Sequence, residues 1–176
     1  MRVISGKYKG KKLDGFLIDG TRPTMDRVKE SMFAMVQNNI DGKICLDLFA
    51  GTGALGIEAL SNGASKVYFV DNNNEIGKIL SKNLNGMDNY QIMITDYNKA
   101  LKYFRDNDIK LDLIILDPPY HRLYINKILD FIYDNNLLNE KGKIIAEYEE
   151  ENVNTCKFKI AKTRDYGVKH VTIFDK

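Results

Sequence analysis

The sequence lacks the features that are typical of metal-binding, membrane-spanning and secreted proteins. Its two cysteines, Cys45 and Cys156, lie far apart and form no metal-ligand spacing, so we expect both to be reduced and buried in strands, with no metal site. No window approaches the roughly 20 apolar residues of a membrane span, and the N-terminus has no apolar stretch of signal-peptide length. These absences favour a cytoplasmic protein.

Net charge is also low, and it is unevenly distributed. The 176 residues carry a net charge of +2, and the composition is that of a globular chain long enough for one domain. Residues 1–12 nevertheless contain no acidic side chain and five basic ones, namely Arg2, Lys7, Lys9, Lys11 and Lys12. A basic end on a nearly neutral body suggests a polyanionic partner, although an excess of solvated lysines explains it equally well.

Strand-like and helix-like segments alternate along most of the chain. Helical spacing follows Pro23, with Thr24 as the expected N-cap, and short apolar runs such as KVYFVD and LDLIILD alternate with helical patterns from residue 43 onward. The runs KFKIAKT and VKHVTIF, joined by a turn near Tyr166 and Gly167, predict an antiparallel pair. We therefore predict an α/β fold with a doubly wound, seven-stranded Rossmann-like sheet whose last strand is antiparallel.

The same patterns divide the chain into three parts. Residues 1–20, broken by four glycines, predict a basic β extension made of short strands or a hairpin. Residues 21–41 predict an N-terminal helix, and residues 42–176 predict the main α/β domain.

The stretch DLFAGTGALG, residues 47–56, contains G-x-G-x-x-G in Gly51, Gly53 and Gly56. It follows an apolar run, where ligand atoms must approach the backbone closely, and a Cβ would collide with them or forbid the required φ angles. Asp71 ends the next strand, where its carboxylate can accept hydrogen bonds from both hydroxyls of a ribose. The pattern indicates an adenosine cofactor, and a nicotinamide dinucleotide fits it equally well.

Other residues favour S-adenosylmethionine. Asp47, four residues before Gly51, could face a cationic amino-acid group, whereas a fixed negative charge there would oppose a pyrophosphate. Asp96 ends the third strand, where it could hold an adenine amino group or cap a helix. Neither His121 nor His170 stands out as the catalyst of a dehydrogenase.

The stretch DPPY, residues 117–120, ends the fourth strand. Pro118 and Pro119 fix φ and remove two backbone N–H donors, which leaves a rigid turn lined with acceptors. An exocyclic amine offers two N–H donors, which the Asp117 carboxylate and the Pro118 carbonyl can accept while aiming the nitrogen at a sulfonium methyl group. Tyr120 can stack on a base that has been taken out of its helix or loop.

Together these motifs resemble the S-adenosylmethionine-dependent methyltransferases that modify exocyclic amines of nucleic acids. RPTMDRVKESMF (residues 22–33) and ISGKYKGKKL (residues 4–13) extend the similarity, over essentially the whole chain, to the RsmD family. Its members methylate the N2 of one guanine in bacterial small-subunit ribosomal RNA. The resemblance implies this activity, an S-adenosylmethionine-binding methyltransferase domain over residues 42–176, and ribosomal RNA or the small ribosomal subunit as partner. We also expect a monomer without metal or membrane contact.

Carried over position by position, the resemblance implies three groups of site residues. The catalytic residues, which hold the guanine amine, are Asp117, Pro118, Pro119 and Tyr120. The cofactor contacts are Asp47, Phe49, Ala50, Gly51, Gly53, Asp71, Asn72, Asp96, Tyr97 and Thr24. The RNA contacts are Lys7, Lys9, Lys11, Lys12, Arg22 and Arg27.

Other functions stay open at this point. A DNA amino-methyltransferase acting on adenine N6 or cytosine N4 shares DPPY, but such enzymes usually need an additional target-recognition domain, for which the chain has little room. Another RNA could be the substrate. A non-catalytic RNA-binding protein with a Rossmann-like fold is disfavoured by the intact DPPY and the complete set of acids. EYEEE, residues 147–151, predicts a solvated acidic strand end, although Glu147 could border the base pocket.

Overall fold

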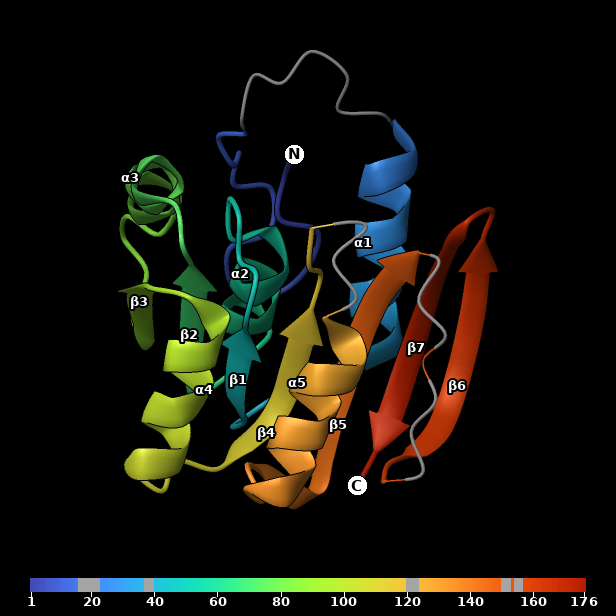
Figure 1. Ribbon diagram of the computed structural model, residues 1–176. Coiled ribbons are helices and arrows are strands. Elements are labelled where there is room, and N and C mark those ends of the chain that lie inside the picture. The colour runs from blue at the N-terminus through green and yellow to red at the C-terminus, as the bar shows by residue number, and fades with distance from the viewer. Residues whose placement is uncertain (16–22, 37–39, 120–123, 150–152, 154–156) are drawn as a thin grey trace.

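The chain forms one central sheet with helices on both faces (Figure 1). The computed structural model describes residues 1–15, 23–36, 40–119, 124–149, 153 and 157–176, with the backbone alone for residues 23–27 and 29. The strands are β1 (Ile44–Asp47), β2 (Lys66–Asp71), β3 (Tyr90–Ile94), β4 (Leu111–Leu116), β5 (Leu138–Glu149), β6 (Lys159–Tyr166) and β7 (Lys169–Asp175). The helices are α1 (Pro23–Val36), α2 (Ala54–Ser61), α3 (Asn74–Asn83), α4 (Tyr97–Asp106) and α5 (Ile125–Asp134).

The strands follow the order β3-β2-β1-β4-β5-β7-β6 across the sheet. Strands β1 to β5 run parallel to one another, whereas β7 runs antiparallel to both β5 and β6. Tyr166 pairs with Lys169, so the connection between β6 and β7 is the short turn that the sequence predicts. The predicted doubly wound, seven-stranded sheet with an antiparallel last strand is confirmed.

Two hydrophobic clusters cover the two faces of the sheet. Strand β4 contributes to both, because Leu113 and Ile115 belong to the cluster under α1, α2 and α3, while Ile114 and Leu116 belong to the cluster under α4 and α5. A central parallel strand is buried on both faces, which explains why its sequence is a continuous apolar run. No helix in the described part of the chain is both long and apolar enough to cross a membrane.

Residues 1–15 pack onto α2 and α3 on the first of these faces. Arg2 and Lys12 form an antiparallel bridge, so the segment turns back on itself as a minimal hairpin. Val3 and Leu13 are buried in the cluster on this face, and the buried Glu58 of α2 accepts a hydrogen bond from the Ile4 backbone N–H. The basic segment is therefore anchored to the body by apolar and polar contacts. The boundaries at residues 20 and 41 stay predictions.

Helix α1 begins one residue earlier than its expected cap. Its first residue is Pro23, so Thr24 lies in the first turn and the prediction of an N-cap at Thr24 is wrong. Proline at the first helical position loses no hydrogen bond, because that N–H has no partner within the helix, and its fixed φ suits the helix.

Cys45 is fully buried in β1, as predicted. Burial raises the pKa of its thiol to about 12, so the thiol is protonated and inert at neutral pH. Cys156 lies outside the described residues.

Candidate functional site

A cavity of about 510 Å³ opens at the carboxyl edge of the sheet, beyond the ends of β1, β2, β3 and β4. Ligands bind at this edge in open α/β sheets. Its lining residues are Leu48, Phe49, Ala50, Gly51, Asp71, Asn72, Asn73, Ile76, Thr95, Asp96, Tyr97, Asp117, Pro118, Pro119 and Tyr124. Ten of the residues predicted for catalysis or cofactor binding line this cavity, and they come from four separate segments of the chain.

Asp71, the last residue of β2, fastens the loops on two sides of the cavity. Its Oδ2 accepts a hydrogen bond from the Gly51 N–H at 3.0 Å, and its Oδ1 accepts one from the Asn73 N–H at 2.9 Å. Each carboxylate oxygen has a second lone pair, so both can also accept from a hydroxyl group. Asp71 thus organises the glycine loop while keeping the capacity to hold a diol.

The three glycines of the loop have different roles. At Gly51, which lines the cavity with a φ of 53°, a Cβ would meet no atom within 4 Å, so the backbone faces open space. A Cβ on Gly53 would lie 2.4 Å from Leu80 Cδ1, and one on Gly56 would lie 2.3 Å from Phe69 Cε1. Gly53 also has a φ of 84°, so the predicted need for a special φ angle is confirmed there. At Gly56 close packing against Phe69, rather than against a ligand, accounts for the glycine, which corrects the reason given from the sequence.

Asp47 is buried at the end of β1, with 1% of its surface exposed, and it does not line the cavity. Its Oδ2 accepts a hydrogen bond from the Gly56 N–H at 2.9 Å. The N–H groups in the first turn of a helix have no partner within the helix, so this carboxylate stabilises the start of α2. A contact between Asp47 and a cofactor stays a prediction.

Asp96 both caps a helix and lines the cavity. It is the N-cap of α4, and its Oδ1 accepts a hydrogen bond from the Asn98 N–H at 2.8 Å. The cap was one of the two roles expected for Asp96, and the carboxylate lies where the second role, a contact with an adenine amino group, is also open to it.

Asp117, Pro118 and Pro119 carry the chain from the end of β4 along the cavity wall. Asp117 is half-buried and Pro118 is buried. Because proline has no N–H, neither proline position can present a backbone donor to the cavity. Tyr120 lies outside the described residues.

Three aromatic rings form one wall of the cavity. Phe49 and Tyr124 are stacked, with ring centroids 6.1 Å apart and an interplanar angle of 2°. Tyr97 lies 4.9 Å from Tyr124 and 5.7 Å from Phe49 between centroids. Such a wall suits a planar base. Sequence reasoning missed Tyr124, because nothing in the spacing distinguishes an aromatic residue at the start of α5.

Comparison with known proteins identifies the family. Residues 1–175 match the family described as Conserved hypothetical protein 95. YlbH of Bacillus subtilis is 36% identical over 182 residues, which covers 100% of this chain and 99% of YlbH. The ribosomal RNA small subunit methyltransferase D of Haemophilus influenzae is 34% identical, over 86% of this chain and 80% of its own length. The solved structure of yhhF from Escherichia coli has a TM-score of 0.84 at 28% identity and covers 100% of this chain and 97% of its own.

The chain belongs to the RsmD family. The predicted membership is confirmed, and with it the class of enzyme, an S-adenosylmethionine-dependent methyltransferase. Among the described residues, no group of three or more histidine, cysteine, aspartate or glutamate side chains could hold a metal ion.

The environment of Glu147 in this RsmD-family protein differs from the solvent-exposed one that the sequence predicts. Only 2% of its surface is exposed, and Lys169 Nζ lies 2.6 Å from its Oε1. The prediction of a solvated acidic end is therefore wrong for Glu147, because β7 pairs with β5 in the sheet and its Lys169 supplies the cation. Leu116 pairs with Ala146, so the register places Glu147 beside Asp117 on the neighbouring strand.

The predicted RNA contacts lie at the N-terminal end. Lys7, Lys9 and Lys12 are exposed, whereas Lys11 is half-buried and donates through Nζ to the Asn85 carbonyl at 2.6 Å. Lys11 is thus partly engaged in holding the segment to the body. Arg22 and the side chains of Thr24 and Arg27 lie outside the described residues.

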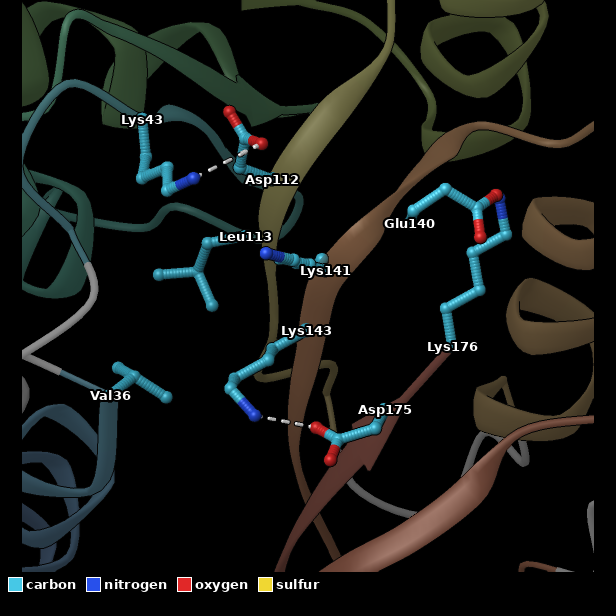
Figure 2. Close-up of a pocket in the computed structure, with 10 residues that line it drawn as sticks. Val36, Lys43, Asp112, Leu113, Glu140, Lys141, Lys143, Asp175 and Lys176 are labelled. Carbon is cyan, nitrogen blue, oxygen red and sulfur yellow. Dashed lines mark hydrogen bonds and ion pairs between the residues drawn. The ribbon is translucent and has the colours of Figure 1, made fainter.

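A second cavity, also of about 510 Å³, lies at the opposite edge of the sheet (Figure 2). Lys143 and Asp175 form an ion pair of 2.6 Å in its wall, and Lys43 and Asp112 form one of 3.8 Å. None of the predicted site residues lines it. Cavity size alone therefore does not identify the site, whereas the convergence of the sequence motifs does.

Replacing Tyr124 by alanine is expected to raise the dissociation constant for S-adenosylhomocysteine about tenfold, because stacking of a base on an aromatic ring contributes roughly 1–3 kcal/mol. Isothermal titration calorimetry measures this directly. Tyr133→Ala on α5, where the ring is 48% exposed and away from the cavity, is the matched control and should bind normally. A normal dissociation constant for the Tyr124 variant, combined with a raised KM for RNA, would assign the ring to the RNA base instead.

Proposed function

We propose that the protein transfers a methyl group from S-adenosylmethionine to the exocyclic N2 of a guanine in small-subunit ribosomal RNA. The observation that carries this proposal is a single cavity lined both by Asp71 and Asp96, which suit an adenosine, and by Asp117 and Pro118, which suit an amine. The Haemophilus influenzae and Escherichia coli relatives, each named ribosomal RNA small subunit methyltransferase D, support the small-subunit RNA as substrate.

The cavity fits this cofactor better than a dinucleotide. Three carboxylates line it, those of Asp71, Asp96 and Asp117, and they would repel a pyrophosphate but attract a sulfonium. In the proposed arrangement Asp71 accepts from the ribose hydroxyls, the aromatic wall and Asp96 hold the adenine, and the backbone at Gly51 lies against the amino-acid part. When bound, the cofactor supplies a methyl group on a positively charged sulfur.

The turn at Asp117, Pro118 and Pro119, which we call the proline corner, would orient the amine for methyl transfer. The Asp117 carboxylate and the Pro118 carbonyl accept the two N–H hydrogens, which fixes the direction of the nitrogen lone pair. As the N–C bond forms and the sulfur–methyl bond breaks, positive charge develops on the nitrogen, and the Asp117 carboxylate stabilises it. The methylated nitrogen is strongly acidic, so it loses a proton to water without a dedicated strong base. The reaction needs no covalent enzyme intermediate.

The proposed partner is the ribosomal RNA itself or the assembled small subunit, contacted by the protein as a monomer. Lys7, Lys9 and Lys12 would bind phosphates, which position the RNA without reading its sequence.

Methyl-labelled cofactor tests the proposal. The protein is incubated with deproteinised small-subunit ribosomal RNA, with small subunits, or with duplex DNA, and the products are digested to nucleosides. We expect label in N2-methylguanosine from one or both ribosomal substrates. Label in DNA alone would establish a DNA amino-methyltransferase, and label in another RNA nucleoside would refute the guanine N2 assignment.

A further inference from the structure

Strand β6 is a basic and exposed edge of the sheet. In the described part of the chain it pairs only with β7, and Lys159 through Asp165 are all exposed. Residues 157–176 contain six lysines and arginines against two aspartates, whereas the whole chain carries only +2. The C-terminal part of the chain is thus basic, like the N-terminal segment, although no sequence motif marks it.

The cations of β6 are available for a partner. Within the described residues, no ion pair involves Lys159 or Lys162, and Arg164 donates through Nη1 to the Ser31 hydroxyl at 3.2 Å. The one acid of the strand, Asp165, is bonded to His170 Nδ1 at 2.6 Å instead. We call Lys159, Lys162 and Arg164 the β6 cations.

Two of the β6 cations share a face of the sheet with the basic N-terminal segment. Lys162 pairs with Ile173 and Arg164 pairs with Val171, and both apolar partners belong to the cluster under α1 and α2. Residues 1–15 pack on this same face through Val3 and Leu13. Figure 1 shows α1 between the N-terminal segment and the β6–β7 pair.

The carboxyl end of β6 lies at the same edge of the sheet as the candidate site. Both β5 and β6 are antiparallel to β7, so β6 runs in the direction of β5 and ends at the carboxyl edge, the edge that carries Asp117. There the Tyr166 hydroxyl is hydrogen-bonded to Ser31 of α1. The β6 cations therefore lie along a strand that contacts α1 through Arg164 and Tyr166 and ends at the edge where the amine would react.

From these observations we propose that the β6 cations form a second phosphate-binding surface, which grips the ribosomal RNA substrate on the side of α1 opposite the N-terminal segment. The inference rests on the proposed function. Its occupant is RNA because unpaired cations on both sides of α1 complement a polyanion longer than the cavity, and because repulsion between lysines opposes pairing of β6 with another copy of itself.

Exchange of all three β6 cations for glutamine tests the surface. Each phosphate contact contributes about 0.7 to 0.9 to the slope of log K against log salt concentration, so the slope should fall by about 2. Binding of labelled small-subunit ribosomal RNA is measured over roughly 50 to 200 mM KCl. We expect the dissociation constant in low salt to rise at least about tenfold, with an unchanged affinity for S-adenosylhomocysteine.

The matched control removes the same charge elsewhere. Lys102→Gln, Arg105→Gln and Lys110→Gln together change the net charge equally, at or beyond α4, which packs on the opposite face of the sheet. This control should keep the parental slope. If the unaltered protein methylates the RNA but the β6 variant and the control have equal slopes, the second surface is refuted and the proposed function stands.

Two further outcomes count against the proposal. If the unaltered protein neither binds nor methylates ribosomal RNA, the proposed function fails and the surface fails with it. If the unaltered protein elutes as a dimer and the β6 variant elutes as a monomer, β6 pairs with a second copy of the chain rather than with RNA.

Discussion

Asp117→Ala is expected to lower kcat for methyl transfer at least about 100-fold while the dissociation constant for S-adenosylmethionine changes only a few-fold. A preorganised group that stabilises developing charge contributes about this much to the rate. Alanine keeps the backbone turn at Pro118 and Pro119 but removes the side-chain carboxylate that we propose accepts a hydrogen bond from the amine. Single-turnover transfer to ribosomal RNA measures the rate, and calorimetry measures the cofactor.

Two variants sharpen the result for Asp117. Asp117→Asn keeps one acceptor oxygen but no negative charge, so its rate should lie between those of the parent and the alanine variant. Asp130→Ala removes an exposed carboxylate of α5 that pairs with Lys157, and it should leave transfer nearly unchanged. Transfer by Asp117→Ala at the parental rate would show that the corner works without its carboxylate.

Asp71→Ala is expected to raise the dissociation constant for S-adenosylhomocysteine at least about 100-fold. Two hydrogen bonds from ribose hydroxyls to a carboxylate contribute about 1.5–3 kcal/mol each, and both would be lost. The variant also leaves the Gly51 and Asn73 N–H groups without the acceptors described above, so the midpoint of thermal unfolding should fall as well. Calorimetry and thermal unfolding followed by circular dichroism measure the two effects.

Asp88→Ala is the control for this experiment, since Asp88 is exposed before β3, at the opposite edge of the sheet. It should keep both the affinity and the unfolding midpoint. If Asp71→Ala lost turnover but bound S-adenosylhomocysteine normally, the carboxylate would have to act on the RNA rather than on the ribose.

The strands could be predicted where burial alone determines the sequence. KVYFVD corresponds to β2 and LDLIIL to β4, because central parallel strands must be apolar on both faces. The position of β7 between β5 and β6 was not predicted, since it depends on contacts between distant segments. The pairing of β7 with β5 also brings Lys169 to Glu147, and it buries a carboxylate that the sequence predicts to be exposed to solvent.

The site could be predicted where function depends on the end of a strand. Asp71 and Asp117 were predicted because parallel strands deliver the residues at their carboxyl ends to one edge, and both line the cavity. Asp47 shares that position, yet the structure turns it toward the Gly56 N–H, since a buried helix start needs an acceptor. Tyr124 was missed because a ring is recognised as part of a wall only when its neighbours, Phe49 and Tyr97, are known in space.

Strand β7 lies between β5 and β6 in the sheet although it follows both in the chain. While a ribosome is still translating the message, β5 therefore has one open edge and β6 has no neighbour. Open strand edges are templates for pairing with other chains. The nascent protein is therefore most exposed to aggregation just before β7 emerges. Once β7 is synthesised, it pairs with both β5 and β6 and covers their open edges.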